Sequence, residues 1–102
     1  MRLMHATPLG NLRSILRRGI LSEKATGALK SAWLCSPSLV WWAVLHTSRR
    51  HRCSSEAVAV LEIDVPRSWL KRAGARGRWH TGGRDVPAVC ILGALTLAQL
   101  EL

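Results

Sequence analysis

The sequence predicts an α+β domain in which two main helices pack on a small, split and largely antiparallel β-sheet. Residues 57–65 alternate apolar side chains between two faces, a period typical of a strand. Residues 9–16 instead space their apolar side chains three and four apart, as on one face of a helix. Short apolar segments surround these elements without a repeat or a linker, and this order fits one α+β domain over residues 1–102.

Composition supports a small globular protein. A chain of 102 residues suits one domain with a modest core, and its 48% apolar content is punctuated by Gly and Pro. No apolar run reaches the roughly eighteen residues needed to cross a bilayer, and the N-terminus lacks the apolar core of a signal peptide. We therefore expect a cytoplasmic protein with no membrane segment.

The charge and the metal-ligating residue types restrict the partners. A formal net charge of +9 favours a phosphate-bearing partner such as RNA, DNA or a dinucleotide. Three cysteines without a CxxC pair predict reduced thiols and no disulfide framework. His46, His51 and Cys53 are spaced by five and two positions, which matches no standard zinc site, so we expect no metal.

A short strand followed by a capped helix opens the chain. The strand carries His5 and Thr7 to one side because alternate residues of a strand share a face. Pro8 is predicted at the first helical position with Thr7 as its N-cap, and Gly19 just past the last turn. A helix N-terminus directly after Thr7 would suit an anion. The apolar residues predicted to form the buried stripe are Leu9, Leu12, Ile15 and Leu16.

The second helix follows a polar loop over residues 22–31 and a strand over 32–35. Ser36 and Pro37 supply an N-cap and a first helical position. The pattern predicts a core position for Trp42 and an exposed one for Trp41, while residues 47–55 form a solvated basic loop.

The last part of the chain is predicted to be mainly strands. Residues 57–65 form the clearest strand, followed by a helical turn over 66–70. Residues 72–84 contain four Gly and form a loop or a hairpin. Two further strands are predicted over residues 86–92 and 95–102.

Residues 5–21, which read HATPLGNLRSILRRGIL, resemble the first motif of the ADP-ribosyltransferase superfamily. The resemblance is to the small bacterial branches that include DarT-type toxins and tRNA 2′-phosphotransferases. Residues 33–37 (WLCSP) are similar to the second motif, and residues 62–70 and 84–91 look like later segments of these small members. The resemblance covers roughly residues 2–92 and implies an ADP-ribosyltransferase-like split sheet.

The resemblance also implies a ligand and the residues that bind it. The ligand is NAD or another molecule containing ADP-ribose: His5 would hold a ribose, and the backbone of Ala6 and Thr7 the carboxamide. Trp33 would stack on the nicotinamide, and an arginine such as Arg49 or Arg50 would bind the pyrophosphate; Arg52 and Arg84 are the other candidates for that role. In the competing interpretations, His5 bonds only to a neighbouring carbonyl and Trp33 is a core residue.

The catalytic acid is where this chain departs from the family. ADP-ribosyl transfer uses a carboxylate to stabilise an oxocarbenium-like transition state, and family members place a glutamate near the start of the late strand. This chain reads Pro87-Ala88-Val89-Cys90 there. Asp85 is the nearest acid and our candidate catalytic residue, with Glu56 as the alternative.

Three other functions remain open. The first is a non-catalytic member that binds RNA or DNA through its basic face. The second is a 2′-phosphotransferase-like activity, since that branch needs no such glutamate and works through His and Arg on phosphate. The third is a small interaction protein that uses Trp41 and the last strand as a dimer edge.

Overall fold

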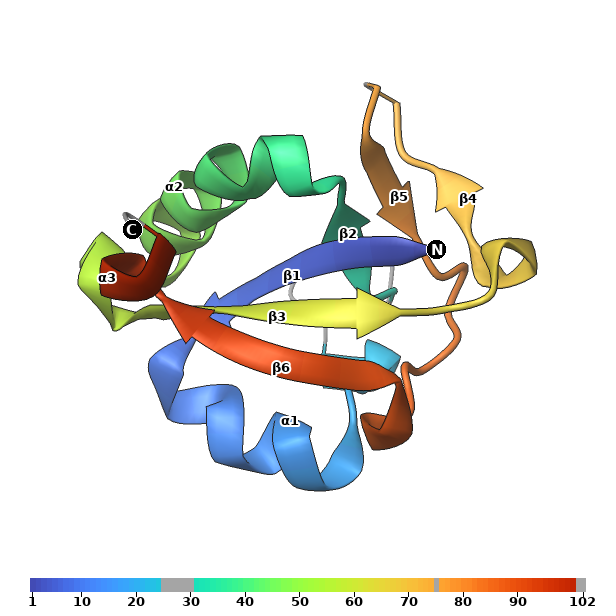
Figure 1. Cartoon of the computed structure of the whole chain (residues 1–102), viewed down its shortest axis with the longest axis horizontal. Coiled ribbons are helices and arrows are strands. Elements are labelled where there is room, and N and C mark those ends of the chain that lie inside the picture. Colours follow the sequence, from blue (N-terminus) through green and yellow to red (C-terminus); the bar gives the residue numbers. More distant parts are fainter. Residues whose placement is uncertain (25–30, 75, 101–102) are drawn as a thin grey trace.

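The computed structural model describes residues 1–24, 31–74 and 76–100, and within this part the chain forms one antiparallel sheet with helices on both faces (Figure 1). The strand order is β4-β5-β2-β1-β3-β6, and every pair of neighbours runs antiparallel. The strands are β1 (Arg2–Pro8), β2 (Trp33–Cys35), β3 (Val58–Asp64), β4 (Lys71–Arg72), β5 (Arg78–His80) and β6 (Ile91–Thr96). The predicted α+β class is confirmed.

Three α-helices and several single 3₁₀ turns connect the strands in the described part. The helices are α1 (Leu12–Arg18), α2 (Val40–His51) and α3 (Leu97–Leu100). The turns are η1 (Leu9–Asn11), η2 (Ser22–Lys24), η3 (Pro37–Leu39), η4 (Ser55–Ala57), η5 (Arg67–Trp69) and η6 (Ala88–Cys90). None of the described helices has the length and apolar character that crossing a bilayer requires.

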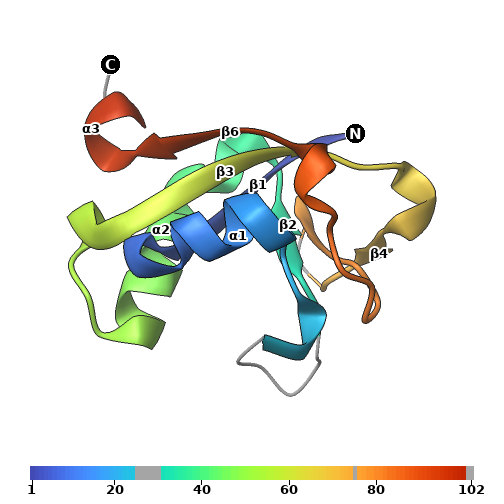
Figure 2. The same ribbon diagram turned by 90° about the horizontal axis from the view of Figure 1, so that it is seen from below.

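The two faces of the sheet bury separate apolar clusters. On one face Leu3, Leu61 and Ile63 pack with the half-buried Ile15 of α1. On the other face the β3 valines Val58 and Val60 pack with Val40 and Val44 of α2, beside Met4 and Ala6 of β1. In Figure 2, α1 lies in front of the sheet and α2 partly behind it. The predicted alternation along β3 is therefore confirmed, because its successive residues enter opposite clusters.

β1 is paired along one edge and nearly unpaired along the other. All seven of its residues have a partner in β3, from Arg2 opposite Asp64 to Pro8 opposite Val58. Its pairing with β2 consists of one position, Met4 opposite Cys35. The two strands therefore part after Met4, and the sheet is open between them.

The start of the first helix differs from the prediction. Pro8 is the last residue of β1, the turn η1 follows it, and α1 begins only at Leu12. Thr7 caps no helix: its Oγ1 accepts a hydrogen bond from Asn11 Nδ2 at 3.4 Å, and no side chain caps η1 or α1. A helix N-terminus therefore does not lie directly after Thr7. Leu9 and Leu16 of the predicted buried stripe are exposed.

Gly19 ends α1 as predicted, for two physical reasons. Its φ of +82° favours glycine, and a Cβ at this position would lie 2.1 Å from the Val86 carbonyl oxygen. This close approach lets Ile20 and Val86 exchange two backbone hydrogen bonds of 2.8 and 2.9 Å.

Helix α2 is longer than predicted, and its buried side is different. The helix continues to His51, so Arg49 and Arg50 lie on its last turn and not in a loop. Its buried residues are Val40, Ala43, Val44 and Thr47. Trp42 lies beside this stripe and is 41% exposed, close to the 43% of Trp41, so the predicted core position of Trp42 is wrong.

The C-terminal third is partly a correction. The turn η5 and the β4–β5 hairpin agree with the expected helical turn and hairpin. In place of a strand over residues 86–92, Val86 forms one isolated bridge, and Pro87 then opens the turn η6 before β6. The expected strand over 95–102 is also wrong, because α3 starts at Leu97, while residues 101–102 lie outside the described part. Gln99 Oε1 accepts the Thr96 N–H at 2.7 Å, as in a capping box.

Candidate functional site: the cleft between β1 and β2

A cleft with a volume of about 790 Å³ lies where β1 and β2 part. Its wall is drawn from β1, α1, β2, α2 and β5. The predicted binding residues His5, Ala6, Thr7, Trp33 and Arg50 all line it. The structure thus brings together five side chains that the sequence places on three separate elements.

The His5 side chain replaces a backbone hydrogen bond at the point where β1 and β2 separate. Its Nδ1 donates a hydrogen bond to the Trp33 carbonyl oxygen at 2.7 Å. The Ala32 carbonyl accepts the Thr81 N–H on the β5 side, so alternation turns the Trp33 carbonyl toward β1. The imidazole therefore satisfies a strand carbonyl that β1 backbone would bond in a continuous sheet.

This bond also fixes the chemistry of the other ring nitrogen. Burial lowers the pKa of His5, and the hydrogen bond to the Trp33 carbonyl opposes this shift in part. The ring is therefore neutral near pH 7, with the proton on Nδ1. Nε2 has no partner among the described residues and carries a lone pair. It is suited to accept a hydrogen bond from a ligand hydroxyl, so the carbonyl bond and the predicted ligand role are compatible.

The backbone of Ala6 faces the unpaired edge of β1. The Ser36 N–H bonds to Gly77 on the β5 side at 2.8 Å, so the peptide groups of Cys35 face β1. Cys35 is opposite Met4, and alternation then turns the N–H and carbonyl of Ala6 to the same edge. Beyond Met4 that edge has no strand partner in the described part of the chain. Ala6 thus offers a donor and an acceptor to the cleft.

Trp33 is a surface residue and not a core residue. Its side chain is 43% exposed, and its ring lies 5.3 Å from that of His80 at an angle of 41°. The opposed pair of Trp33 and His80 in β2 and β5 holds the indole at the cleft wall. An aromatic face in this position is available for stacking against a flat ligand ring.

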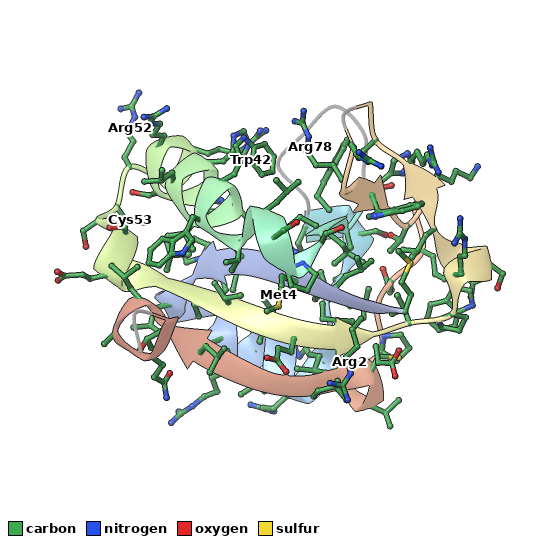
Figure 3. The ribbon with its side chains drawn as sticks, turned by 45° about the horizontal axis from the view of Figure 1, so that its top comes forward. Arg2, Met4, Trp42, Arg52, Cys53 and Arg78 are labelled. Atoms are coloured by element: carbon green, nitrogen blue, oxygen red, sulfur yellow. The ribbon has the colours of Figure 1, made fainter. Side chains whose placement is uncertain are left out.

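Arg78 is a cleft residue that the sequence analysis missed. Its guanidinium lies 4.7 Å from the Trp42 ring centroid, and Trp42 stacks on His46 at 5.1 Å. Figure 3 shows Trp42 and Arg78 on the same side of the sheet. The sequence signal for Arg78 is the alternation of Arg78, Trp79 and His80: Trp79 packs on the core, so Arg78 and His80 lie on the other face of β5, where Arg78 contacts Trp42 of α2.

The remaining predicted residues lie outside the cleft. Arg49 is exposed on α2, and Arg84 lies 4.7 Å over the Trp69 ring; neither lines the cleft. Asp85 Oδ1 accepts the Ser22 N–H at 2.8 Å and the Ser22 hydroxyl at 2.9 Å. Asp85 and Glu56 are both exposed and also lie outside the lining.

The cleft is therefore cationic. Lys24, Arg50 and Arg78 contribute to its lining, which contains no Asp or Glu from the described part of the chain. Within residues 1–24, 31–74 and 76–100, no group of three His, Cys, Asp or Glu side chains is placed to hold a metal ion. The wall is suited to an anion that also carries hydroxyl groups and a flat ring.

No family model matches the chain, and no curated protein is significantly similar to it.

Proposed function

We propose that the cleft between β1 and β2 binds NAD or another molecule containing ADP-ribose, as in an ADP-ribosyltransferase-like domain. The observation that carries the proposal is the neutral His5, oriented by the Trp33 carbonyl at the mouth of a cationic cleft. A ribose supplies a hydroxyl that can donate to Nε2, and a pyrophosphate supplies an anion that matches the positive charge of the cleft lining.

Each part of the ligand has a matching group in the cleft. The N–H and carbonyl of Ala6 would pair with the carboxamide, whose amide has one donor side and one acceptor side, while Thr7, whose peptide groups face β3, lines the cleft beside it. Trp33 would stack on the nicotinamide ring, and Arg50 with Arg78 would bind the pyrophosphate. Arg78 takes this role in preference to Arg49, which is outside the cleft lining.

Transfer of ADP-ribose to a nucleic acid or protein would require a carboxylate near the ribose. Asp85 is the acid that we propose for this role, and it would first have to leave its hydrogen bonds with Ser22. A cationic cleft stabilises a bound anion but not an oxocarbenium-like charge. The lining therefore supports ligand binding more strongly than ADP-ribosyl transfer.

A second candidate is the 2′-phosphotransferase-like activity, which the acid-free lining favours. A His and arginines without a carboxylate suit the transfer of a ribose 2′-phosphate to NAD, in which the phosphate displaces nicotinamide and the RNA is left with a 2′-hydroxyl, as in the branch that the sequence resembles. An RNA bearing a 2′-phosphate, incubated with the protein and NAD, would lose that phosphate. Retention of the phosphate would exclude this second candidate.

Titration calorimetry with ADP-ribose and NAD tests the proposed function. We expect both to bind and nicotinamide alone to bind far more weakly, because nicotinamide has neither ribose nor pyrophosphate. His5→Asn keeps a side-chain N–H near the position of Nδ1 but removes Nε2, so it should weaken ADP-ribose binding about tenfold, the value of one lost hydrogen bond.

Arg13→Gln is the control, since Arg13 is exposed on α1 and is not part of the cleft lining. It should leave the affinity within about twofold. Absence of a thermal shift and of binding heat with either ligand would refute the proposal. Equal losses in His5→Asn and Arg13→Gln would show that general charge, not the cleft, attracts the ligand.

A further inference from the structure

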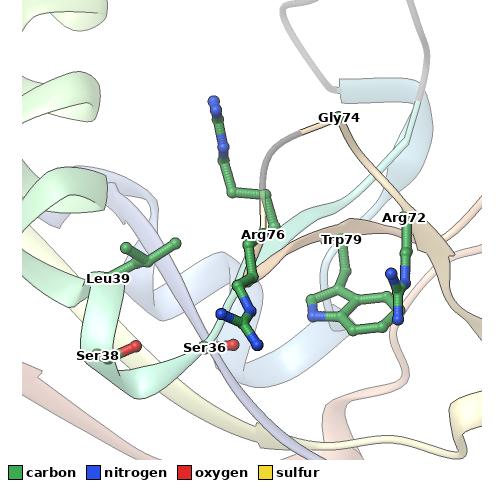
Figure 4. Close-up of a pocket in the computed structure, with 9 residues that line it drawn as sticks. Ser36, Ser38, Leu39, Arg72, Gly74, Arg76 and Trp79 are labelled. Carbon is green, nitrogen blue, oxygen red and sulfur yellow. The ribbon is translucent and has the colours of Figure 1, made fainter.

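A second hollow, of about 900 Å³, lies between the β4–β5 hairpin and the turn η3 (Figure 4). We call it the hairpin pocket. Three arginines line it, Arg72, Arg76 and Arg78, together with Trp79 and the serines Ser36 and Ser38. Its lining contains no Asp or Glu from the described part of the chain.

The charges of these arginines are not neutralised by any acidic side chain in the described part of the chain. Within the described residues Arg72, Arg76 and Arg78 form no ion pair. Two of them are instead held on aromatic rings: Arg72 lies 5.7 Å from the Trp79 centroid and Arg78 lies 4.7 Å from the Trp42 centroid. Such a contact orients a guanidinium while leaving its charge and its edge donors available to an anion.

Further hydrogen-bond donors line the same wall. The hydroxyls of Ser36 and Ser38 make no hydrogen bond to other described residues, and Figure 4 shows both on the turn beside the hairpin. The Trp79 indole N–H is buried and has no acceptor among residues 1–24, 31–74 and 76–100. Gly77 allows the turn and the hairpin to approach, because a Cβ there would lie 3.0 Å from Leu39 Cδ1 and 3.3 Å from Ser36 Oγ.

The hairpin pocket borders the cleft at Arg78. Arg78 lines both hollows, and the exposed rings of Trp33 and Trp42 lie on the same side of the sheet. Arg72 and Arg76 line the hairpin pocket on the far side of Arg78 from the cleft. Exposed aromatic faces beside a track of cations are the combination that binds a single strand of nucleic acid.

We propose that the hairpin pocket binds the backbone phosphates of a single-stranded nucleic acid whose terminal or reacting nucleotide lies in the cleft. The proposal rests on the proposed function for the position of that nucleotide, and it adds the path of the strand. The side chains assigned to the strand phosphates are Arg72 and Arg76, with Ser36 and Ser38 as neutral donors, while Arg78 at the border keeps its role toward the ligand in the cleft.

The test uses fluorescence anisotropy of labelled single-stranded DNA and RNA, each about ten nucleotides long, a length within the range such sites cover. At about 0.1 M salt each phosphate contact contributes roughly fivefold to affinity, because log K falls with a slope of about 0.7 per neutralised phosphate. The double variant Arg72→Gln/Arg76→Gln should therefore bind about twentyfold more weakly and show a salt slope smaller by about 1.4.

The matched control is Arg13→Gln/Arg17→Gln, which removes the same charge from exposed positions on α1 and should lose no more than about threefold. Arg72→Lys/Arg76→Lys keeps the charge and should bind within about threefold of the parent chain, which separates a lost contact from a folding defect. Equal losses in the hairpin and α1 variants, or no binding of either strand, would overturn the proposal.

ADP-ribose titrations of the same variants keep the two proposals separate. We expect the glutamine double variant to bind ADP-ribose like the parent chain, because Arg72 and Arg76 do not line the cleft. Loss of strand binding with intact ADP-ribose binding supports the hairpin pocket. Strand binding that depends on the hairpin in a protein that never binds ADP-ribose would refute the proposed function alone.

Discussion

Along one edge of β1 all seven residues pair with β3, whereas along the other edge only Met4 pairs with β2. The paired edge joins two strands that the core clusters fix, and Leu61 and Val60 of β3 are fully buried. The other edge borders a cleft of about 790 Å³ and is closed by a side chain, His5, rather than by backbone.

The comparison explains how so small a domain can carry a site. Because all seven residues of β1 pair with β3, the opposite edge can present the peptide groups of Ala6 and the His5 ring, which the Trp33 carbonyl orients. A ligand site needs such unpaired groups on a fixed element. The paired edge should therefore determine stability, and the open edge should determine binding.

The largest effect should come from the paired edge. Leu61→Ala removes a fully buried side chain from β3 and should lower the free energy of unfolding by about 2–5 kcal/mol. Trp33→Ala, on β2 across the cleft from the open edge, should cost about 1 kcal/mol or less, since Trp33 is 43% exposed. Urea unfolding measures both, and a larger loss in Trp33→Ala would contradict the comparison.

Ligand binding should depend on Trp33 of β2 and not on Trp41 of α2. Trp33→Ala should weaken binding of NAD about tenfold, because a stacked aromatic contributes about 1–3 kcal/mol. Trp41→Ala is the matched control: Trp41 is equally exposed, at 43%, but does not line the cleft. Calorimetry that finds the same affinity for both variants would remove Trp33 from the site.

A smaller effect should appear as a pH dependence of stability. The pKa of His5 lies below its ordinary value of 6.5 in the folded chain, because burial disfavours the imidazolium. Below pH 6.5 the unfolded chain therefore binds more protons, so this contribution to stability is intact above that pH and falls as the pH is lowered through it. Urea midpoints of the parent chain and His5→Asn should converge toward acid pH. Parallel pH profiles would show that His5 does not titrate differently in the two states.

The smallest effect concerns Cys35, the partner of Met4 at the single β1–β2 position. Burial raises the pKa of its thiol to about 11, so little thiolate is present at neutral pH. Cys53 and Cys90 are only half buried. A thiol reagent should label these two first and Cys35 slowly, as read by mass spectrometry. Prompt labelling of Cys35 would mean that β1 and β2 separate even at Met4.

The sequence predicted those elements whose pattern is unambiguous. The alternation over residues 57–65 identifies β3 because both of its faces meet apolar clusters. The predicted strand over residues 95–102 was wrong. The leucines of this segment suit a strand, but Thr96 and Gln99 form a cap that starts α3. That signal, Thr-x-x-Gln before apolar residues, was present in the sequence.

The site was predictable along single strands but not between them. Placing His5 and Thr7 on one face needed only the period of β1. The hydrogen bond from His5 to Trp33 and the position of Arg78 in the cleft lining depend on how strands pair that are distant in the sequence. His5 and Trp33 are 28 residues apart, and a local sequence pattern does not encode such pairing. Arg49 was assigned to a loop, and the helical turn that contains it leaves it outside the cleft lining while Arg50 is part of it.

The most direct test of the account is the state of the His5 ring with and without ADP-ribose. Long-range ¹H–¹⁵N spectra of the parent chain should show a neutral ring with the proton on Nδ1. Addition of ADP-ribose should shift the Nε2 resonance and the Ala6 amide while leaving the Arg13 amide unchanged. A His5 ring and Ala6 amide that do not respond to saturating ADP-ribose would contradict the claim that the open edge of β1 is a ligand site.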